Sequence, residues 1–95
     1  MAAYLIAEIE VTDPAGYEDY RRQVLAVVTK HGGKFLVRGG NVKSKEGGWT
    51  PKRLVVLEFP SMAQAEKFYD SAEYAPLLRL RQSASRGKLV IVEGA

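Results

Sequence analysis

The chain contains one pattern of elements twice: an extended apolar segment, an amphipathic helix and a second extended segment. In the first half, residues 4–11 and 35–42 flank the helix, and in the second half residues 54–59 and 89–93 do so. This βαββαβ order predicts an α+β fold, the ferredoxin-like plait, in which helices cover one face of a four-stranded antiparallel sheet. Because the plait carries many unrelated activities, the order of elements predicts an architecture and no particular chemistry.

Residues that favour the start of a helix stand at the expected places. Asp13 can accept hydrogen bonds from free amides of the first turn, and Pro14 follows it where no amide donor is needed. Ser61 and Gln64 match a capping box, in which the Gln64 side chain reaches back to the amide of the serine. Both predicted helices therefore have a defined start.

Glycine and proline mark the predicted irregular points of the chain. Gly39 and Gly40 interrupt the second extended segment, where they predict a bend or bulge with a backbone conformation closed to other residues. After the second helix, Ser71 predicts another cap and a helical extension, which Pro76 is expected to kink and Gly87 to end.

Composition limits the chemistry that the chain can perform. The 95 residues are expected to form one domain, residues 1–95, and the net charge of +3 is spread over interleaved acidic and basic residues. Without cysteine and with one histidine, the sequence excludes disulfides, thiolate sites and multi-histidine metal sites, and it contains no cofactor signature. The longest uncharged apolar run, residues 1–7, is too short to span a bilayer and lacks the basic start of a signal peptide. We therefore expect a soluble, cytoplasmic protein with no membrane partner.

One face of the predicted sheet has no helix to cover it. If Leu5, Ala7, Ile9 and Val11 face the helices, alternation leaves a second set of side chains on the opposite face. This open face is predicted to carry Tyr4, Ile6, Glu8, Leu36, Arg38, Leu54, Val56, Glu58, Leu89, Ile91 and Glu93. Such a face is too apolar to remain in water, so it predicts a twofold homodimer with the two sheets face to face.

Several short motifs follow one another in an order that is similar to a known family. They are Val11-Thr12-Asp13-Pro14 with Tyr17 and Tyr20, then Arg38-Gly39-Gly40, Leu57-Glu58-Phe59-Pro60-Ser61, Phe68-Tyr69-Asp70-Ser71, Glu73-Tyr74 and Arg81. Over nearly the whole chain this set resembles the bacterial domain-of-unknown-function family numbered 1330. Phe68 stands where many members have tryptophan, so the resemblance implies aromatic packing there and no indole contact.

That family resembles part of the dimeric α/β-barrel superfamily, whose relatives include cofactor-independent monooxygenases of antibiotic biosynthesis, haem-degrading enzymes and small isomerases. The resemblance therefore implies a homodimer of plaits. It implies no established reaction.

Arg38 is the charged residue that the sequence sets apart. It lies in a strand beside two glycines, where backbone can approach a ligand and a guanidinium can hold a carboxylate through two hydrogen bonds. It can equally pair with Glu58 or with the partner chain. Glu8 and Glu58 can form an acid–base pair on one sheet face, or a network that Arg38 bridges.

Trp49, Tyr69 and Arg81 complete the candidate ligand contacts. Trp49, on a glycine-rich connection, can act as a lid over a pocket or as an anchor on the partner chain. Tyr69 belongs to a set of tyrosines at helical spacing that are expected mainly in the core, where one or two can line a cavity beside Arg81. His31 ends the apolar stripe of the first helix, either as a base that needs a carboxylate or as a cation favoured by the helix dipole.

Two functions remain open after these observations. The first is binding or transformation of a small organic molecule, in particular an organic anion, in a mostly apolar pocket whose polar end is Arg38. Without a nucleophile constellation, any reaction would be a cofactor-free proton transfer or oxidation, and whether the chain is an enzyme stays undecided. The second is a non-catalytic homodimeric module, which a fully packed core would favour. A nucleic-acid partner is not expected, because Glu8 and Glu58 occupy the central positions where RNA-binding plaits carry aromatic residues.

Overall fold

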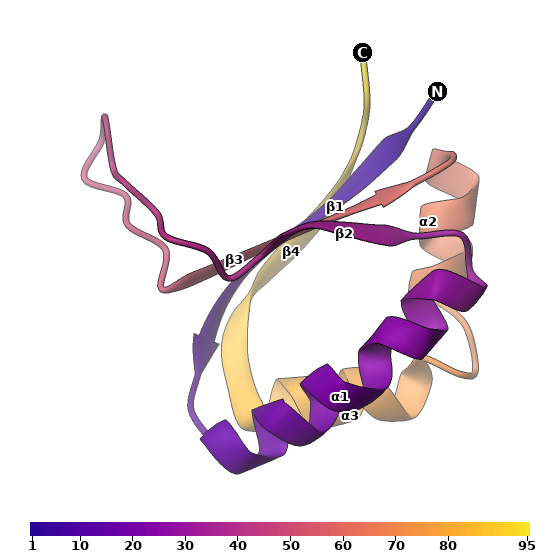
Figure 1. Ribbon diagram of the computed structural model, residues 1–95, viewed down its shortest axis with the longest axis horizontal. Helices are drawn as coiled ribbons and strands as arrows, with labels where there is room; N and C mark the ends of the chain where they lie inside the picture. The colour runs from indigo at the N-terminus through magenta and orange to yellow at the C-terminus, as the bar shows by residue number, and fades with distance from the viewer.

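Residues 1–95 are described by a computed structural model, in which helices cover one side of a four-stranded antiparallel sheet (Figure 1). The strands are β1 (Ala3–Val11), β2 (Lys34–Arg38), β3 (Arg53–Phe59) and β4 (Ser85–Glu93), and the helices are α1 (Pro14–Lys30), α2 (Met62–Tyr69) and α3 (Ala75–Ala84). The strands lie side by side in the order β2-β3-β1-β4. The predicted α+β, ferredoxin-like arrangement is confirmed.

The predicted helix starts are confirmed, with one difference in the second. Asp13 accepts a hydrogen bond from the amide of Gly16 at 3.3 Å, and Ser61 accepts one from the amide of Gln64 at 3.1 Å. The Gln64 side chain does not reach back to the serine. Its amide nitrogen donates to the carbonyl oxygen of His31 at 2.8 Å, which ties the start of α2 to the end of α1.

The segment after α2 differs from the prediction. Ser71 caps as expected, because its hydroxyl accepts from the amide of Tyr74 at 3.1 Å. A turn then separates α2 from α3, and Pro76 lies in the first turn of α3, where it causes no kink. The chain passes directly from Ala84 into β4, so Gly87 lies inside a strand and does not end a helix. A Cβ atom there would collide with the carbonyl oxygen of Glu8 on β1.

Alternation predicts the two faces correctly for the central strands and wrongly for β4. The buried residues on the helix side are Leu5, Ala7 and Ile9 of β1 and Val55, Leu57 and Phe59 of β3, as expected. On β4, however, Leu89 and Ile91 pack against this core, whereas Val90 and Val92 lie on the open face with 59% and 46% of their surface exposed. The four residues are all apolar, so the sequence offers no polar position that distinguishes the two faces.

Strand β2 is shorter than predicted and contains a bulge earlier than expected. It ends at Arg38 and does not continue past the two glycines. The register shifts between Phe35 and Val37, so the residues after the shift point to the opposite face from the one that simple alternation predicts. As a result Arg38 lies opposite Val55 and faces the helices. The predicted position of Arg38 on the open face is therefore wrong. Gly39 has a φ of +75°, which confirms the predicted glycine-only conformation at this point.

The connection between β2 and β3, residues 39–52, extends beyond the end of the sheet (Figure 1). The two chain termini lie next to each other at the opposite end, where the amide of Gly94 donates to the carbonyl oxygen of Ala2 at 2.8 Å. None of the three helices combines the length and the apolar composition that crossing a membrane requires.

Candidate functional site

A pocket lies between the helices and the covered face of the sheet. Sixteen residues line it, twelve of them hydrophobic, and they come from both central strands, from β2 and β4 and from all three helices. Its charged lining residues are Arg21, Arg38, Arg53 and Arg81, and it contains no aspartate or glutamate. The cavity has a volume of about 30 Å³, which is enough for one or two water molecules and not for an organic molecule.

Arg38 forms part of the pocket wall and has no acidic partner. One of its terminal nitrogens donates to the carbonyl oxygen of Arg21 at 2.8 Å, and its guanidinium lies 4.2 Å from the centre of the Phe35 ring. Burial lowers the pKa of Arg38, and repulsion from Arg21 and Arg53 lowers it further. An arginine pKa is high enough that the group stays charged at neutral pH. Its predicted alternative, a pair with Glu58, is wrong because the bulge puts these side chains on opposite faces.

Arg53 is a pocket residue that the sequence reasoning missed. Its Nε donates to the hydroxyl of Tyr17 at 3.1 Å, and its guanidinium lies 5.3 Å from the centre of the Tyr17 ring. Gly39 makes room for this group, because a Cβ atom at that position would overlap the guanidinium. Alternation along β3 contains the signal, since Arg53 precedes the inward-facing Val55 by two positions.

Two tyrosines and an arginine form a buried network between α1 and α3. The hydroxyls of Tyr20 and Tyr74 lie 2.9 Å apart, and Nε of Arg81 donates to the Tyr74 hydroxyl at 3.3 Å. Burial raises the pKa of Tyr20 far above its ordinary value of 10.0, with further contributions from Tyr74, so this phenol is neutral at physiological pH. Tyr69 packs beside the network, with its ring centre 5.8 Å from that of Tyr74. Arg81 is 7% exposed and lines the pocket; Tyr69 does not.

The structure does not bring Glu8 and Glu58 together. On neighbouring strands Glu58 lies opposite Tyr4, and Glu8 lies opposite Leu54, four positions farther along β1. Glu58 pairs with Lys34, which lies opposite it on β2, at 3.1 Å. Neither the predicted acid–base pair nor the network bridged by Arg38 forms. Antiparallel pairing separates the two carboxylates along the strands, and the bulge in β2 moves the Arg38 side chain to the other face of the sheet.

Trp49 lies on the open face and not over the pocket. Its indole nitrogen donates to Oε2 of Glu8 at 2.8 Å, and its ring lies beside Ile6, Leu54 and Val90. It remains 59% exposed. Its predicted role as a lid therefore has no support in this arrangement, and its role as an anchor on a partner chain stays a prediction.

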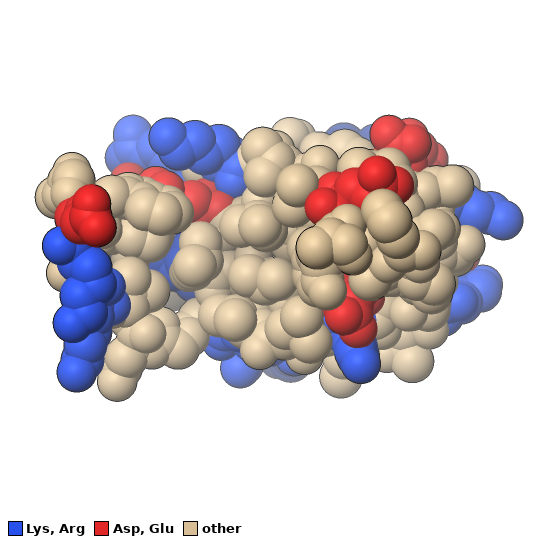
Figure 2. Space-filling model, turned by 90° about the horizontal axis from the view of Figure 1, so that it is seen from above, with Lys and Arg blue, Asp and Glu red and all other residues tan.

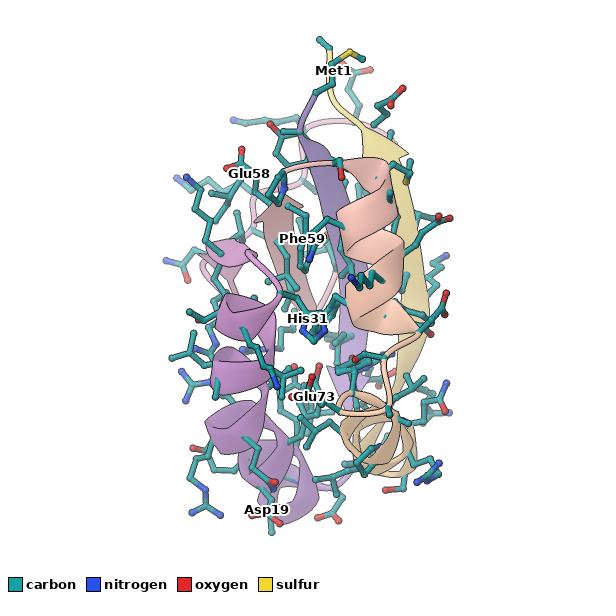
Figure 3. The ribbon with its side chains drawn as sticks, turned by 90° about the vertical axis from the view of Figure 1, so that its right-hand side faces the viewer. Met1, Asp19, His31, Glu58, Phe59 and Glu73 are labelled. Carbon is teal, nitrogen blue, oxygen red and sulfur yellow. The ribbon has the colours of Figure 1, made fainter.

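His31 has a carboxylate partner that is distant in sequence. Its Nδ1 lies 2.9 Å from the carbonyl oxygen of Val27, which requires a proton on that nitrogen, and its Nε2 lies 3.8 Å from Glu73. Figure 3 shows the two side chains facing each other between α1 and the connection from α2 to α3. Glu73 also accepts from Lys30 at 2.6 Å, and this bond lowers the pKa of the carboxyl. His31 does not line the pocket. Its contacts connect the end of α1 to the residues around α2, and they do not bring it near the pocket arginines.

The side chains offer no metal centre. No group of three or more histidine, aspartate or glutamate side chains lies close enough together to hold a metal ion.

Residues 2–95 match the family of domains of unknown function DUF1330. The chain belongs to this family. The match confirms the resemblance drawn from the ordered motifs. No curated protein sequence matches this DUF1330 chain.

Solved structures with the same fold come from proteins of different kinds. A protein of unknown function from Rhodopseudomonas palustris has a TM-score of 0.79 at 18% identity, with 99% of this chain and 82% of that one covered. SnoaB, a cofactor-independent oxygenase from Streptomyces nogalater, has a TM-score of 0.67 at 12% identity, with 99% and 93% covered. The de novo designed protein Foldit4 has a TM-score of 0.65 at 11% identity and full coverage of both chains. At these identities the likeness shows the fold alone.

Proposed function

We propose that this DUF1330 protein binds a small organic anion in the pocket between its helices and its sheet. The observation that supports this function is the pocket lining, which is mostly apolar, contains four guanidinium groups and includes no carboxylate. Of these arginines only Arg21 pairs with a carboxylate, and largely uncompensated positive charge in an apolar site favours an anionic ligand with an apolar body. In this proposal residues 1–95 act as one domain, in the cytoplasm, and Arg38 supplies the anchoring charge.

The titratable groups of the pocket limit what could happen to such a ligand. They are arginines and tyrosines, residue types that donate hydrogen bonds and offer no base comparable to a histidine or a carboxylate. The ligand would therefore arrive already ionised. A cofactor-independent oxidation or isomerisation in this pocket would need a ligand whose own anion is reactive.

Binding requires the pocket to enlarge, because the cavity of about 30 Å³ does not admit an organic molecule. Arg38 is the wall residue best placed to move. Its guanidinium is held by one hydrogen bond to a backbone carbonyl and by stacking on Phe35, and no ion pair restrains it. A ligand carboxylate would replace that carbonyl as its acceptor.

The first test is a binding experiment with small carboxylic acids that have an apolar body, namely benzoate, phenylacetate, indole-3-acetate and octanoate. At least one is expected to raise the melting temperature and to shift backbone amide resonances of β2 and β3. Arg38→Lys keeps the charge and loses the planar fork, so it should weaken binding roughly tenfold. Arg86→Lys is the matched control, because Arg86 is 76% exposed and lies outside the pocket. Equal affinities of wild type and Arg38→Lys would return Arg38 to a structural role.

The small cavity favours a second candidate function, a homodimeric module that binds no small molecule. A core without space for a ligand is what such a module requires. This alternative predicts that none of the four acids changes the melting temperature or the amide resonances, although the protein is dimeric.

The open face of the sheet supports the homodimer that both functions assume. The exposed large apolar side chains on this face or lying over it are Leu36, Val37, Trp49, Val90 and Val92. Seen from the side away from α1 and α3, most lysines and arginines lie towards the rim of the molecule, and a few acidic residues interrupt the surface between them (Figure 2). Contiguous apolar surface of this kind marks an interface, and a twofold pairing of two sheets would cover it on both chains.

A further inference from the structure

We infer that Arg38 and Arg53 form a two-armed clamp for a single ligand carboxylate, with Tyr17 and Gly39 holding the second arm in position. This inference rests on the proposed function and names both the ligand class and a further binding residue. The ligand is a monocarboxylate whose flat apolar body packs against the aromatic and aliphatic walls of the pocket.

The two arginines lie close together on one face of adjacent strands. Arg38 lies opposite Val55, and Arg53 precedes Val55 by two positions, so the arginines are diagonal neighbours across β2 and β3. The Cβ atoms of such neighbours lie about 7–8 Å apart or somewhat less, a separation that two long side chains bridge easily. Neither guanidinium forms an ion pair with any acidic residue of the chain. Two unpaired like charges repel, and an anion between them removes that repulsion.

Arg53 is fixed in a way that leaves its donors available. Its Nε is occupied by the hydroxyl of Tyr17 at 3.1 Å, whereas its terminal nitrogens donate to no protein acceptor. The absence of a side chain at Gly39, whose φ is +75°, allows the guanidinium to lie against the backbone of β2. Because the Tyr17 oxygen accepts from Arg53, the proton of that hydroxyl is free to donate to the same ligand.

The geometry and the charge of these donors fit a carboxylate. Planar guanidinium forks match the two oxygens of a carboxylate in geometry. Arg21, the third arginine nearby, lies 3.6 Å from Glu18 and so brings a compensated charge. Apart from Arg81, which donates to the Tyr74 hydroxyl, two uncompensated positive charges remain, one mobile and one fixed, and they suit a monoanion attached to an apolar body.

The test compares two pairs of probes that differ in charge and hardly in shape: benzoate with benzamide, and phenylacetate with phenylacetamide. Amide-resonance titrations at pH 7 give a dissociation constant for each. In wild type, at least one carboxylate is expected to bind ten times or more tightly than its amide. Arg53→Gln should reduce that ratio severalfold while leaving amide binding unchanged, because only Arg38 then remains to bind the carboxylate, and Arg53→Lys should fall between Arg53→Gln and wild type. Arg86→Gln, outside the pocket, should keep the wild-type ratio.

Gly39→Ala provides a variant that leaves both arginines in the sequence. Its new methyl group would displace the Arg53 guanidinium, so the ratio should fall as it does in Arg53→Gln. Melting temperatures confirm that each variant is folded. If wild type binds carboxylates and amides equally, or if the ratio of their dissociation constants is unchanged in Arg53→Gln, the two-arginine clamp is wrong. Ligand binding in the pocket would still stand. Binding of none of the four probes and none of the larger acids would overturn the proposed function itself.

Discussion

The buried hydroxyl of Tyr20 couples the stability of the protein to alkaline pH. Its pKa in the folded state is raised, first by burial and then by Tyr74, whereas in the unfolded chain it ionises near 10.0. A raised folded-state pKa stabilises the fold fully below the unfolded pKa, and this contribution is lost as the pH rises through and beyond that value. The folded protein therefore resists ionisation of this residue until it unfolds.

Tyr20→Phe tests this coupling. At pH 7 the variant should lose about 1–3 kcal/mol of unfolding free energy, because the Tyr74 hydroxyl loses a buried partner. Between pH 9 and pH 11 its unfolding free energy should fall less steeply than that of wild type, since the titrating group is gone. Urea unfolding followed by circular dichroism at a series of pH values gives both quantities. Parallel pH profiles would show that Tyr20 ionises in the folded state.

At the scale of single elements, the sequence predicts faces where polar and apolar residues alternate and fails where they do not. Strand β1 alternates with Glu8 on one side, so its two faces are predicted correctly. In β4 the apolar run 89–92 fits either orientation, and only pairing with β1 decides between them. In β2 the bulge falls between Phe35 and Val37, next to a leucine that either face tolerates, so no residue type signals it.

The same limits apply to the candidate site. The two glycines beside a strand arginine predict that Arg38 contacts a ligand, and the structure does place Arg38 on the pocket, although on the other face of the sheet. The inward orientation of Arg53 can be predicted from the sequence, since alternation from Val55 places both side chains on the same face of β3. Its partner Tyr17 comes from α1, 36 positions earlier, and such long-range contacts follow from packing that one sequence does not encode locally.

The turn after β2 allows a matched test of the glycine requirement. Gly39 has a φ of +75° and borders the Arg53 guanidinium, whereas a Cβ atom at Gly40 would have no neighbouring atom within 4 Å. Gly39→Val should destabilise the protein by about 1–3 kcal/mol, the usual cost of a side chain in a strained backbone region. Gly40→Val should change the unfolding free energy much less. Chemical denaturation of both variants makes the comparison, and equal losses would remove the special role of Gly39.

For the molecule as a whole, the open sheet face predicts a stable dimer. Light scattering at micromolar concentration should give twice the chain mass of 10.5 kDa. Val56→Asp puts a charge in the middle of that face, opposite Ile6 on β1, and is expected to cause substantial loss of structure because the fold and the interface are coupled. Leu25→Asp is the control, since Leu25 is 48% exposed on α1, on the other side of the molecule. A wild-type monomer, or a dimeric Val56→Asp variant, would contradict this assembly.

The bulge in β2 also bears on how the molecule avoids unwanted association. Strand β2 is one edge of the sheet, and an edge strand exposes backbone groups that can pair with the edge of another molecule. Here the edge is five residues long, and the bulge interrupts its hydrogen-bonding register between Phe35 and Val37. The irregularity that turns Arg38 towards the pocket thus leaves little regular backbone at this edge for a second sheet to extend.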